Sequence, residues 1–145
     1  MKLEKIKVYT NAQVENGMCA YAFLMETVER TPKYEKLFHN KLAHVDKKFD
    51  HIKGQMLVIY YALNQLCKPC NVELHTNLHH LEGVWAKIKK DGRIPNDAKR
   101  INEWQHIIDH EKRRQANLAI HFDNSSPQIK LVRNVARQII YETIH

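Results

Sequence analysis

Two amide side chains stand where predicted strands end, and a ligand site is expected at such positions. Asn11 follows Lys5–Thr10, in which Ile and Val alternate with polar residues, and Asn77 follows the similar segment Val72–Thr76. Alternation of this kind predicts half-buried strands, and ligands of parallel sheets bind beyond the carboxyl ends of the strands. Amides both donate and accept hydrogen bonds, so they suit ribose hydroxyls and phosphate oxygens.

The segment between these strands predicts the helix that connects them in parallel. Gln55–Leu66 is apolar almost all round, which is typical of a helix buried on both sides. Lys68-Pro69 breaks the chain before the second strand, and the polar segment Asp46–Lys53 is expected to be a loop. A strand, a crossover helix and a parallel strand would place Asn11 and Asn77 at one edge of a sheet.

The other segments extend this unit to a mixed sheet. Asn11–Gly17 is expected to be a turn-rich break, in which Asn16-Gly17 is a strong hairpin signal. Ser126-Pro127 predicts an N-cap followed by proline at the start of a last helix, which runs nearly to His145. The order of elements, β-β-β-α-β-α-α-β-α, predicts one α/β domain over residues 1–145, with a five-stranded mixed sheet, an antiparallel edge and helices on both faces. The remaining elements are strands at Cys19–Met25, Tyr34–His44 and Leu118–Phe122, and helices at His79–Lys90 and Ala98–Arg114.

This order and the residues at its junctions resemble type 1 ribonuclease H and the wider ribonuclease H-like fold, over nearly the whole chain. The first catalytic acid of that family follows a threonine at the end of a strand, as Asn11 does in Tyr9-Thr10-Asn11. The resemblance places the other three acids at Gln55, at Asn77 and at Asn134. It implies an enzyme in which two Mg²⁺ ions, held by carboxylates, cleave the RNA strand of an RNA–DNA hybrid.

Each position that should carry an acid carries the isosteric amide instead. Mg²⁺ loses its water reluctantly and needs anionic oxygens to hold it, so we expect neither Mg²⁺ nor another cofactor to bind. We therefore expect no catalytic residues and a protein that binds RNA–DNA hybrid or double-stranded RNA without cutting it. The stretch before the last helix has Asp123 and no histidine where the family has one. This wider departure favours a natural inactive member.

Basic residues gather around the break at Gly92, where the family has a basic protrusion that docks on the DNA strand. The net charge of +7, with ten histidines, also attracts polyanions. Trp104 resembles the tryptophan that follows the family's protrusion. We therefore expect nucleic-acid contact from Trp85 and Trp104, from His79 beside Asn77, and from Lys87, Lys89, Lys90, Arg93, Lys99 and Arg100.

Three alternatives stay open, and with them the question of whether the protein is an enzyme. The chain could be a protein-interaction or scaffold module that has kept the fold and lost nucleic acid. It could be an engineered inactive variant of a hybrid ribonuclease that carries acids at the four amide positions. It could also be a working nuclease that uses Asp50, Asp123 or Glu15.

The composition limits the compartment. No run of 18 apolar residues is present, so no membrane span is expected. The start, MKLEKIKVYT, has no apolar signal core and is expected to form a strand. Three cysteines cannot all pair, which fits a reducing compartment, and we interpret Cys67 and Cys70 as structural. A cytoplasmic protein is expected, and the oligomeric state stays open.

Overall fold

The computed structural model describes residues 3–144, in which five strands form one mixed sheet in the order β3-β2-β1-β4-β5. β1 pairs antiparallel with β2 and parallel with β4, so the antiparallel edge and the parallel crossover are as predicted. The order of the elements is also confirmed. The strands are β1 Glu4–Glu15, β2 Met18–Thr27, β3 Glu35–Leu42, β4 Cys70–Thr76 and β5 Ala116–Phe122, and the helices are α1 His51–Asn64, α2 His79–Asp91, α3 Ile101–Arg114 and α4 Pro127–Ile144.

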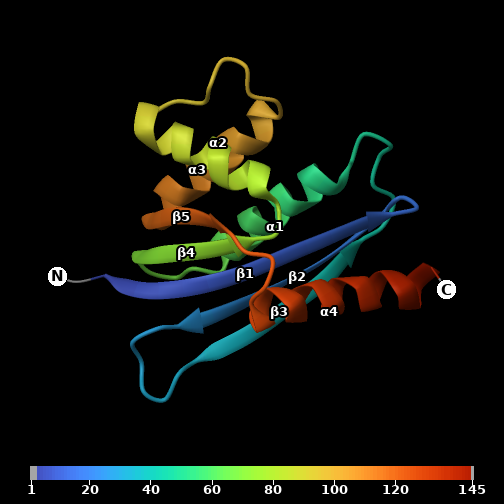
Figure 1. Cartoon of the computed structure of the whole chain (residues 1–145), viewed down its shortest axis with the longest axis horizontal. Coiled ribbons are helices and arrows are strands. Elements are labelled where there is room, and N and C mark those ends of the chain that lie inside the picture. Colours follow the sequence, from blue (N-terminus) through green and yellow to red (C-terminus); the bar gives the residue numbers. More distant parts are fainter. Residues whose placement is uncertain (1–2, 145) are drawn as a thin grey trace.

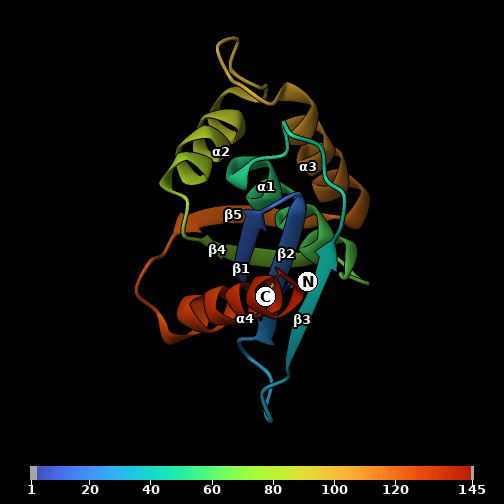
Figure 2. The ribbon, with the colours of Figure 1, turned by 90° about the vertical axis from the view of Figure 1, so that its right-hand side faces the viewer.

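Helices cover both faces of the sheet, as expected. Figure 2 shows α4 on one side and α1, α2 and α3 on the other. On the first side Ile129 and Val132 of α4 pack over Tyr9, Ala22 and Leu24 of the sheet. On the second side the apolar helix α1 lies between β1 and α3, which explains why it has almost no polar face.

The first strand is longer than predicted, because the expected break after Thr10 does not occur. β1 continues to Glu15 and pairs with β2 from Asn11↔Ala22 to Glu15↔Met18. The hairpin turn itself is confirmed, with positive φ angles of 49° at Asn16 and 76° at Gly17. This pair of angles is typical of the two-residue hairpin turn that Asn-Gly favours.

The central helix starts earlier than predicted, within the segment that was expected to be a loop. α1 begins at His51, because the Asp50 side chain caps it by accepting a hydrogen bond from the Lys53 backbone N–H at 2.9 Å. Gly54 then lets the helix approach β1 closely. A Cβ atom at Gly54 would lie 3.1 Å from Val14 Cγ2 and 3.3 Å from the Ala12 Cβ.

The parallel pairing of β1 with β4 stops short of the end of β1. The last paired residues are Tyr9 and His75, and β4 ends at Thr76. Beyond this point β1 has only β2 as a strand neighbour in the described sheet. The departure of β4 leaves one side of the second half of β1 without a strand neighbour in the described sheet, and we call this gap in the strand pairing the notch. Figure 1 shows α1 and α4 on either side of this half of β1.

Candidate functional site

Two of the four amides meet at the notch beside β1. Gln55, one turn into α1, is fully buried and donates from Nε2 to the Ala12 backbone oxygen at 3.1 Å. The same nitrogen also lies 3.3 Å from Oδ1 of Asn77, which follows β4. Gln55 therefore joins the helix to β1 at Ala12 and to the residue that follows β4.

Asn11 lies next to this pair, and one of its two polar side-chain atoms has no hydrogen-bond partner among the described residues. Its Oδ1 accepts from Gln13 Nε2 at 2.7 Å. Its Nδ2, however, is buried without a partner, and so is Oε1 of Gln55. An unpaired buried donor or acceptor costs about 1–3 kcal/mol. We refer to Asn11, Gln55 and Asn77 as the amide cluster.

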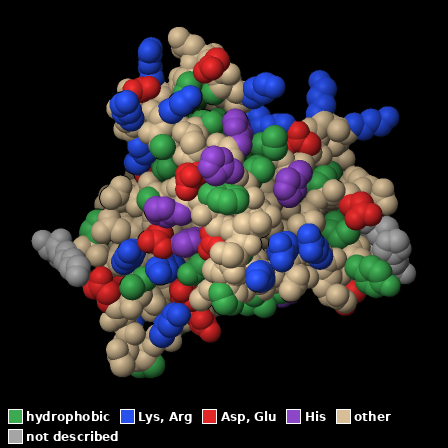
Figure 3. All heavy atoms as spheres, in the orientation of Figure 1, with side chains coloured by type: hydrophobic (Ala, Val, Ile, Leu, Met, Phe, Trp, Pro, Cys, Tyr) green, Lys and Arg blue, Asp and Glu red, His purple; other side chains and the backbone are tan. Residues whose placement is uncertain are grey.

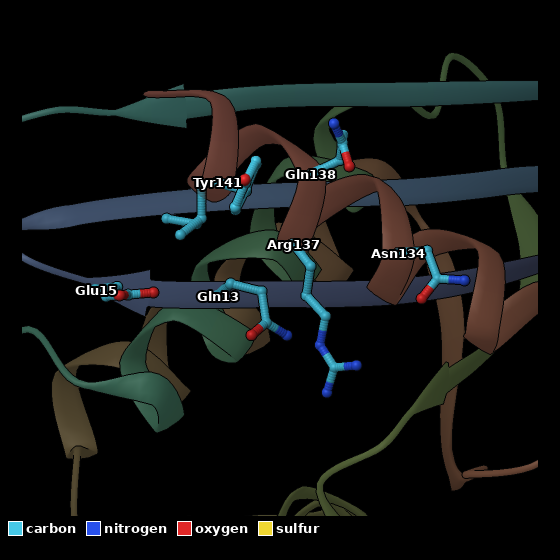
Figure 4. Close-up of a pocket in the computed structure, with 7 residues that line it drawn as sticks. Gln13, Glu15, Asn134, Arg137, Gln138 and Tyr141 are labelled. Atoms are coloured by element: carbon cyan, nitrogen blue, oxygen red, sulfur yellow. The ribbon is translucent and has the colours of Figure 1, made fainter. Parts of the chain in front are cut away.

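Asn134 is not part of the amide cluster in the described structure. It is exposed on α4 and makes no recorded hydrogen bond to the other three amides. Instead it lines a groove between β1 and α4, together with Gln13 (Figure 4). Gln13 therefore lines the groove that contains Asn134 and also hydrogen-bonds to Asn11. Sequence analysis missed Gln13, although it lies two residues after Asn11 and shares its face once the strand is known to continue.

His51 is a second neighbour that sequence analysis missed. Its Nε2 lies 3.5 Å from Nε2 of Gln55, one helical turn away. The two hydrogens of this amide nitrogen already point to the oxygens of Ala12 and Asn77, so the imidazole is a close neighbour of Gln55 and not a third acceptor. Burial lowers the pKa of His51, and the nearby Asp50 carboxylate opposes this effect only in part.

The amide cluster does not fit a pair of Mg²⁺ ions. Two of its three carbonyl oxygens already accept hydrogen bonds from amide N–H groups, and none of the three side chains is charged. Mg²⁺ in proteins is held mainly by carboxylates and phosphates. Within residues 3–144, no three His, Cys, Asp or Glu side chains are arranged to hold a metal ion either.

The three acids considered as substitutes for the amides lie elsewhere. Asp50 caps α1 and forms an ion pair with Arg100. Glu15 is exposed at the end of β1. Asp123 holds the segment before α4, since its carboxylate lies 2.9 Å from His75 Nδ1 and accepts from the backbone of Ser126 at 3.0 Å. In the described chain, none of these acids hydrogen-bonds to the amide cluster.

The two tryptophans are core residues and not stacking surfaces, which corrects the sequence-based expectation. Trp85 and Trp104 are 2% and 1% exposed. Their rings stack on each other, with centroids 6.1 Å apart and planes 16° apart. Trp85 also donates from Nε1 to the backbone oxygen of Leu118. Basic flanking residues suggested surface exposure, but α2 and α3 pack these rings against each other.

The basic residues divide into paired and unpaired groups. Lys89 lies 2.5 Å from the buried Glu111 carboxylate, and Arg100 pairs with Asp50, so both are held by protein acids. His79 is exposed at the start of α2, beside Glu82 and the ring of Phe122. Figure 3 shows Lys and Arg side chains projecting along the edge formed by α2 and the α2–α3 loop. Exposed there without an ion pair to a described residue are Lys87, Lys90, Arg93 and Lys99.

The cysteines have no ligand partners. Cys19, Cys67 and Cys70 are all free, and burial raises the pKa of the Cys70 thiol to about 11. A thiol of this kind is unreactive near neutral pH. The described part of the chain also contains no helix both long and apolar enough to cross a membrane.

Comparison with known proteins gives no match by sequence and clear matches by structure. No family model and no curated sequence matches the chain. The N-terminal RNase H domain of Rv2228c from Mycobacterium tuberculosis superposes with a TM-score of 0.68 at 7% identity, over 98% of this chain and 99% of that one. LC9-RNase H1, a type 1 RNase H with the type 2 active-site motif, gives 0.67 at 10% identity, over 95% and 72%.

The fold is that of ribonuclease H. A third ribonuclease H structure, that of LC11-RNase H1 in complex with an RNA/DNA hybrid, gives a TM-score of 0.62 at 13% identity, over 94% of this chain and 99% of that one. The expected ribonuclease H-like fold is therefore confirmed. At identities this low, the structural likeness establishes the fold alone. The chemistry of the site has to be judged from its side chains.

Proposed function

We propose that this ribonuclease H-like protein binds nucleic acid at the amide cluster without cutting it. The observation that supports this proposal is the pair of unsatisfied buried atoms, a donor on Asn11 and an acceptor on Gln55, at a cluster that contains no carboxylate. Both atoms are buried, so a ligand supplies the missing partners only when the side chains around the cluster move aside. A neutral site also does not repel the phosphate backbone, as four carboxylates would.

The two atoms suit the hydroxyl groups of RNA. A ribose 2′-hydroxyl both donates and accepts, and it is the group by which a protein distinguishes RNA from DNA. Asn11 Nδ2 needs an acceptor and Gln55 Oε1 needs a donor, so hydroxyl groups meet either requirement. The favoured ligands are therefore RNA–DNA hybrid and structured RNA, in preference to duplex DNA.

Two further observations support a polyanionic ligand. The net charge of the chain is +7, and four basic residues without an acidic partner project from α2 and the loop that follows it. LC11-RNase H1, which has the same fold, has been solved with an RNA/DNA hybrid. We propose that Lys87, Lys90, Arg93 and Lys99 contact phosphates, whereas Lys89 and Arg100 mainly stabilise the fold.

A binding titration with three labelled duplexes and one labelled single strand of equal length tests the proposal. Fluorescence anisotropy with RNA–DNA hybrid, double-stranded RNA, duplex DNA and single-stranded RNA is measured from low to physiological salt. We expect hybrid and double-stranded RNA to bind more tightly than duplex DNA, with an affinity that falls steeply as salt rises. Incubation with Mg²⁺ or Mn²⁺ should leave the RNA intact.

Other outcomes separate the alternatives. Absence of binding even at low salt would contradict the proposal and leave a protein-interaction module. Metal-dependent RNA fragments from the unaltered chain would show a working nuclease. If only the variant Asn11→Asp/Gln55→Glu/Asn77→Asp/Asn134→Asp cleaves hybrid with Mg²⁺, the cleft retains the geometry of an enzyme whose active form carries acids.

A further inference from the structure

A polar groove runs between the second half of β1 and α4, next to the amide cluster. Its volume is about 540 Å³, and Figure 4 shows the side chains that surround it. The groove exists because β4 ends at Thr76 while β1 continues to Glu15, so no strand fills the space beside β1. It is lined by Gln13, Glu15, Asn134, Arg137, Gln138, Ile140 and Tyr141.

Arg137 and Glu15 are the two charged residues of the described chain that line this groove. Its side chain extends from α4 across β1 towards the open side, close to Gln13 in Figure 4. Arg137 is exposed and forms no ion pair with a described carboxylate. Glu15 lies towards the end of β1 and is likewise not bonded to it, and Glu142 on α4 accepts from Gln138 at 2.9 Å instead.

The polar residues of α4 that border the groove recur with a helical period. Asn134, Arg137 and Tyr141 line the groove, and Lys130 precedes them by one turn without lining it. The intervals of four, three and four residues place all four on one face of the helix. The opposite face of α4 is buried on β1 and β2 through residues such as Ile129 and Val132. The exposed stripe thus presents cations, an amide and a phenol beside one groove.

The groove is continuous with the amide cluster through a single side chain. Gln13 lines the groove, and it also donates to Oδ1 of Asn11 at 2.7 Å. Asn11 and Gln55 are completely buried, so a chain-like ligand at the cluster touches the partly exposed Asn77 and Gln13, and Arg137 after them. The paired cations Lys89 and Arg100 cannot offer an equivalent contact, since protein acids already hold them.

We propose that this groove binds the phosphodiester backbone of the nucleic-acid strand that leaves the amide cluster. Arg137 pairs with one phosphate through two parallel N–H bonds, the geometry that a guanidinium favours. The side-chain amides of Gln13, Asn134 and Gln138 hydrogen-bond to sugar and phosphate oxygens. This inference rests on the proposed function, and it adds to it a contact surface on α4 that is separate from the basic residues of α2.

The test compares Arg137→Gln with Arg113→Gln, in the full chain. Arg113 is an equally exposed arginine of α3, on the other side of the sheet, and it has no described ion pair either. Both variants lose one charge, so a non-specific effect of net charge is the same for both. Thermal unfolding should match the unaltered protein in each case, because both side chains are exposed.

For Arg137→Gln we expect the affinity for RNA–DNA hybrid to fall about tenfold at low salt, with the slope of log K against log salt smaller by about 1. Arg113→Gln should change neither quantity. Inorganic phosphate should not compete below millimolar concentrations, since a backbone and not a free anion is bound. Equal binding by Arg137→Gln and the unaltered protein would overturn this inference alone. If the unaltered protein binds no nucleic acid, the proposed function fails, and the inference fails with it.

Discussion

Asn11 and Gln55 are completely buried, and yet each retains one hydrogen-bonding atom without a partner. Residues selected only for stability would satisfy these atoms or replace them with apolar groups. The acids in the neighbourhood show the opposite behaviour, since Asp50 and Asp123 are fully engaged as a helix cap and a loop clamp. The unmet requirement at the amide cluster is therefore a residue-scale observation that favours a ligand, although both atoms are buried in the described structure.

Gln55→Glu should destabilise the protein near neutral pH. The buried nitrogen of Gln55 donates to two oxygens, those of Ala12 and Asn77, and a carboxylate oxygen there would face both without a proton. We expect a loss of about 2–4 kcal/mol at pH 7 in urea unfolding. The pKa of the introduced acid should be raised, so the loss should shrink as the pH falls towards 4.

Asn134→Asp is the matched control for this change. Asn134 is exposed, so its conversion to an acid should alter the free energy of unfolding by less than about 0.5 kcal/mol. Equal destabilisation by the two variants would show that burial of Gln55 is not the cause.

Asp123 should contribute stability that is lost in acid. Burial works to raise the pKa of this carboxyl, but hydrogen bonds from Ser126, Ser125 and His75 outweigh it and lower the pKa to about 2. A lowered pKa stabilises the folded state above the ordinary carboxyl pKa, and that stability disappears as the pH falls from about 4 to 2. Urea unfolding across this range should show a loss of about 2 kcal/mol. Asp123→Asn should lose this part of the pH dependence.

At the scale of the elements, the close approach of α1 to β1 positions the site. Gly54 sits where a Cβ would touch Val14 and Ala12, and the next residue is Gln55. The edge of the sheet is organised by helices as well. The outer strand β5 has its backbone N–H groups at Leu118 and Phe122 bonded to Glu111 and Glu82, which discourages pairing with another chain.

The two glycines inside helices should respond to alanine in opposite directions. Gly54→Ala should lower the free energy of unfolding by about 1–2 kcal/mol, because the added methyl pushes α1 away from β1. Gly83 in α2 has no atom within 4 Å of an added Cβ, so Gly83→Ala should stabilise by about 0.5–1 kcal/mol through helix propensity. Thermal and urea unfolding of the two single variants check this. A stabilising Gly54→Ala would contradict the close approach described here.

At the scale of the whole molecule, two basic surfaces lie on opposite sides of the sheet. The α2–α3 segment projects on one side and α4 covers the other (Figures 1 and 2). The amide cluster lies between them, where β4 leaves the sheet beside β1. A nucleic acid held at the cluster can therefore contact the basic residues on both sides of the sheet at once.

Neutralising the lysines of α2 one group at a time should distinguish those that contribute to binding from the one that contributes to stability. Lys87→Gln/Lys90→Gln removes two unpaired charges, and should reduce the slope of log K against log salt by about 2 without changing stability. Lys89→Gln breaks the ion pair with the buried Glu111 carboxylate, and should cost about 1 kcal/mol or more of stability. Anisotropy titrations and urea unfolding of both variants decide this. A double variant that binds as the unaltered protein does would exclude this side from the interface.

The sequence by itself determined the order of the elements and the placement of Asn77 directly after β4, whereas Asn11 lies within β1 and not at its end. Alternation, caps and turn signals such as Asn16-Gly17 are local patterns, so they can be recognised without knowledge of the tertiary contacts. Even the missed second half of β1 was visible in the alternation of Gln13 and Glu15 with Ala12 and Val14. The expectation of a turn-rich break over Asn11–Gly17 hid it.

Only the tertiary structure decided which side chains are available. In the folded chain, Trp85 is buried against Trp104, and Lys89 forms an ion pair with Glu111, which is 22 residues away in the sequence. Arg137, by contrast, stays exposed in the groove beside Gln13. These outcomes depend on how segments distant in the sequence pack together, and neither the type of a residue nor the charge of its neighbours encodes that packing. Periodicity therefore fixes which face of an element is apolar, whereas the partners of its polar groups are fixed only when the elements assemble.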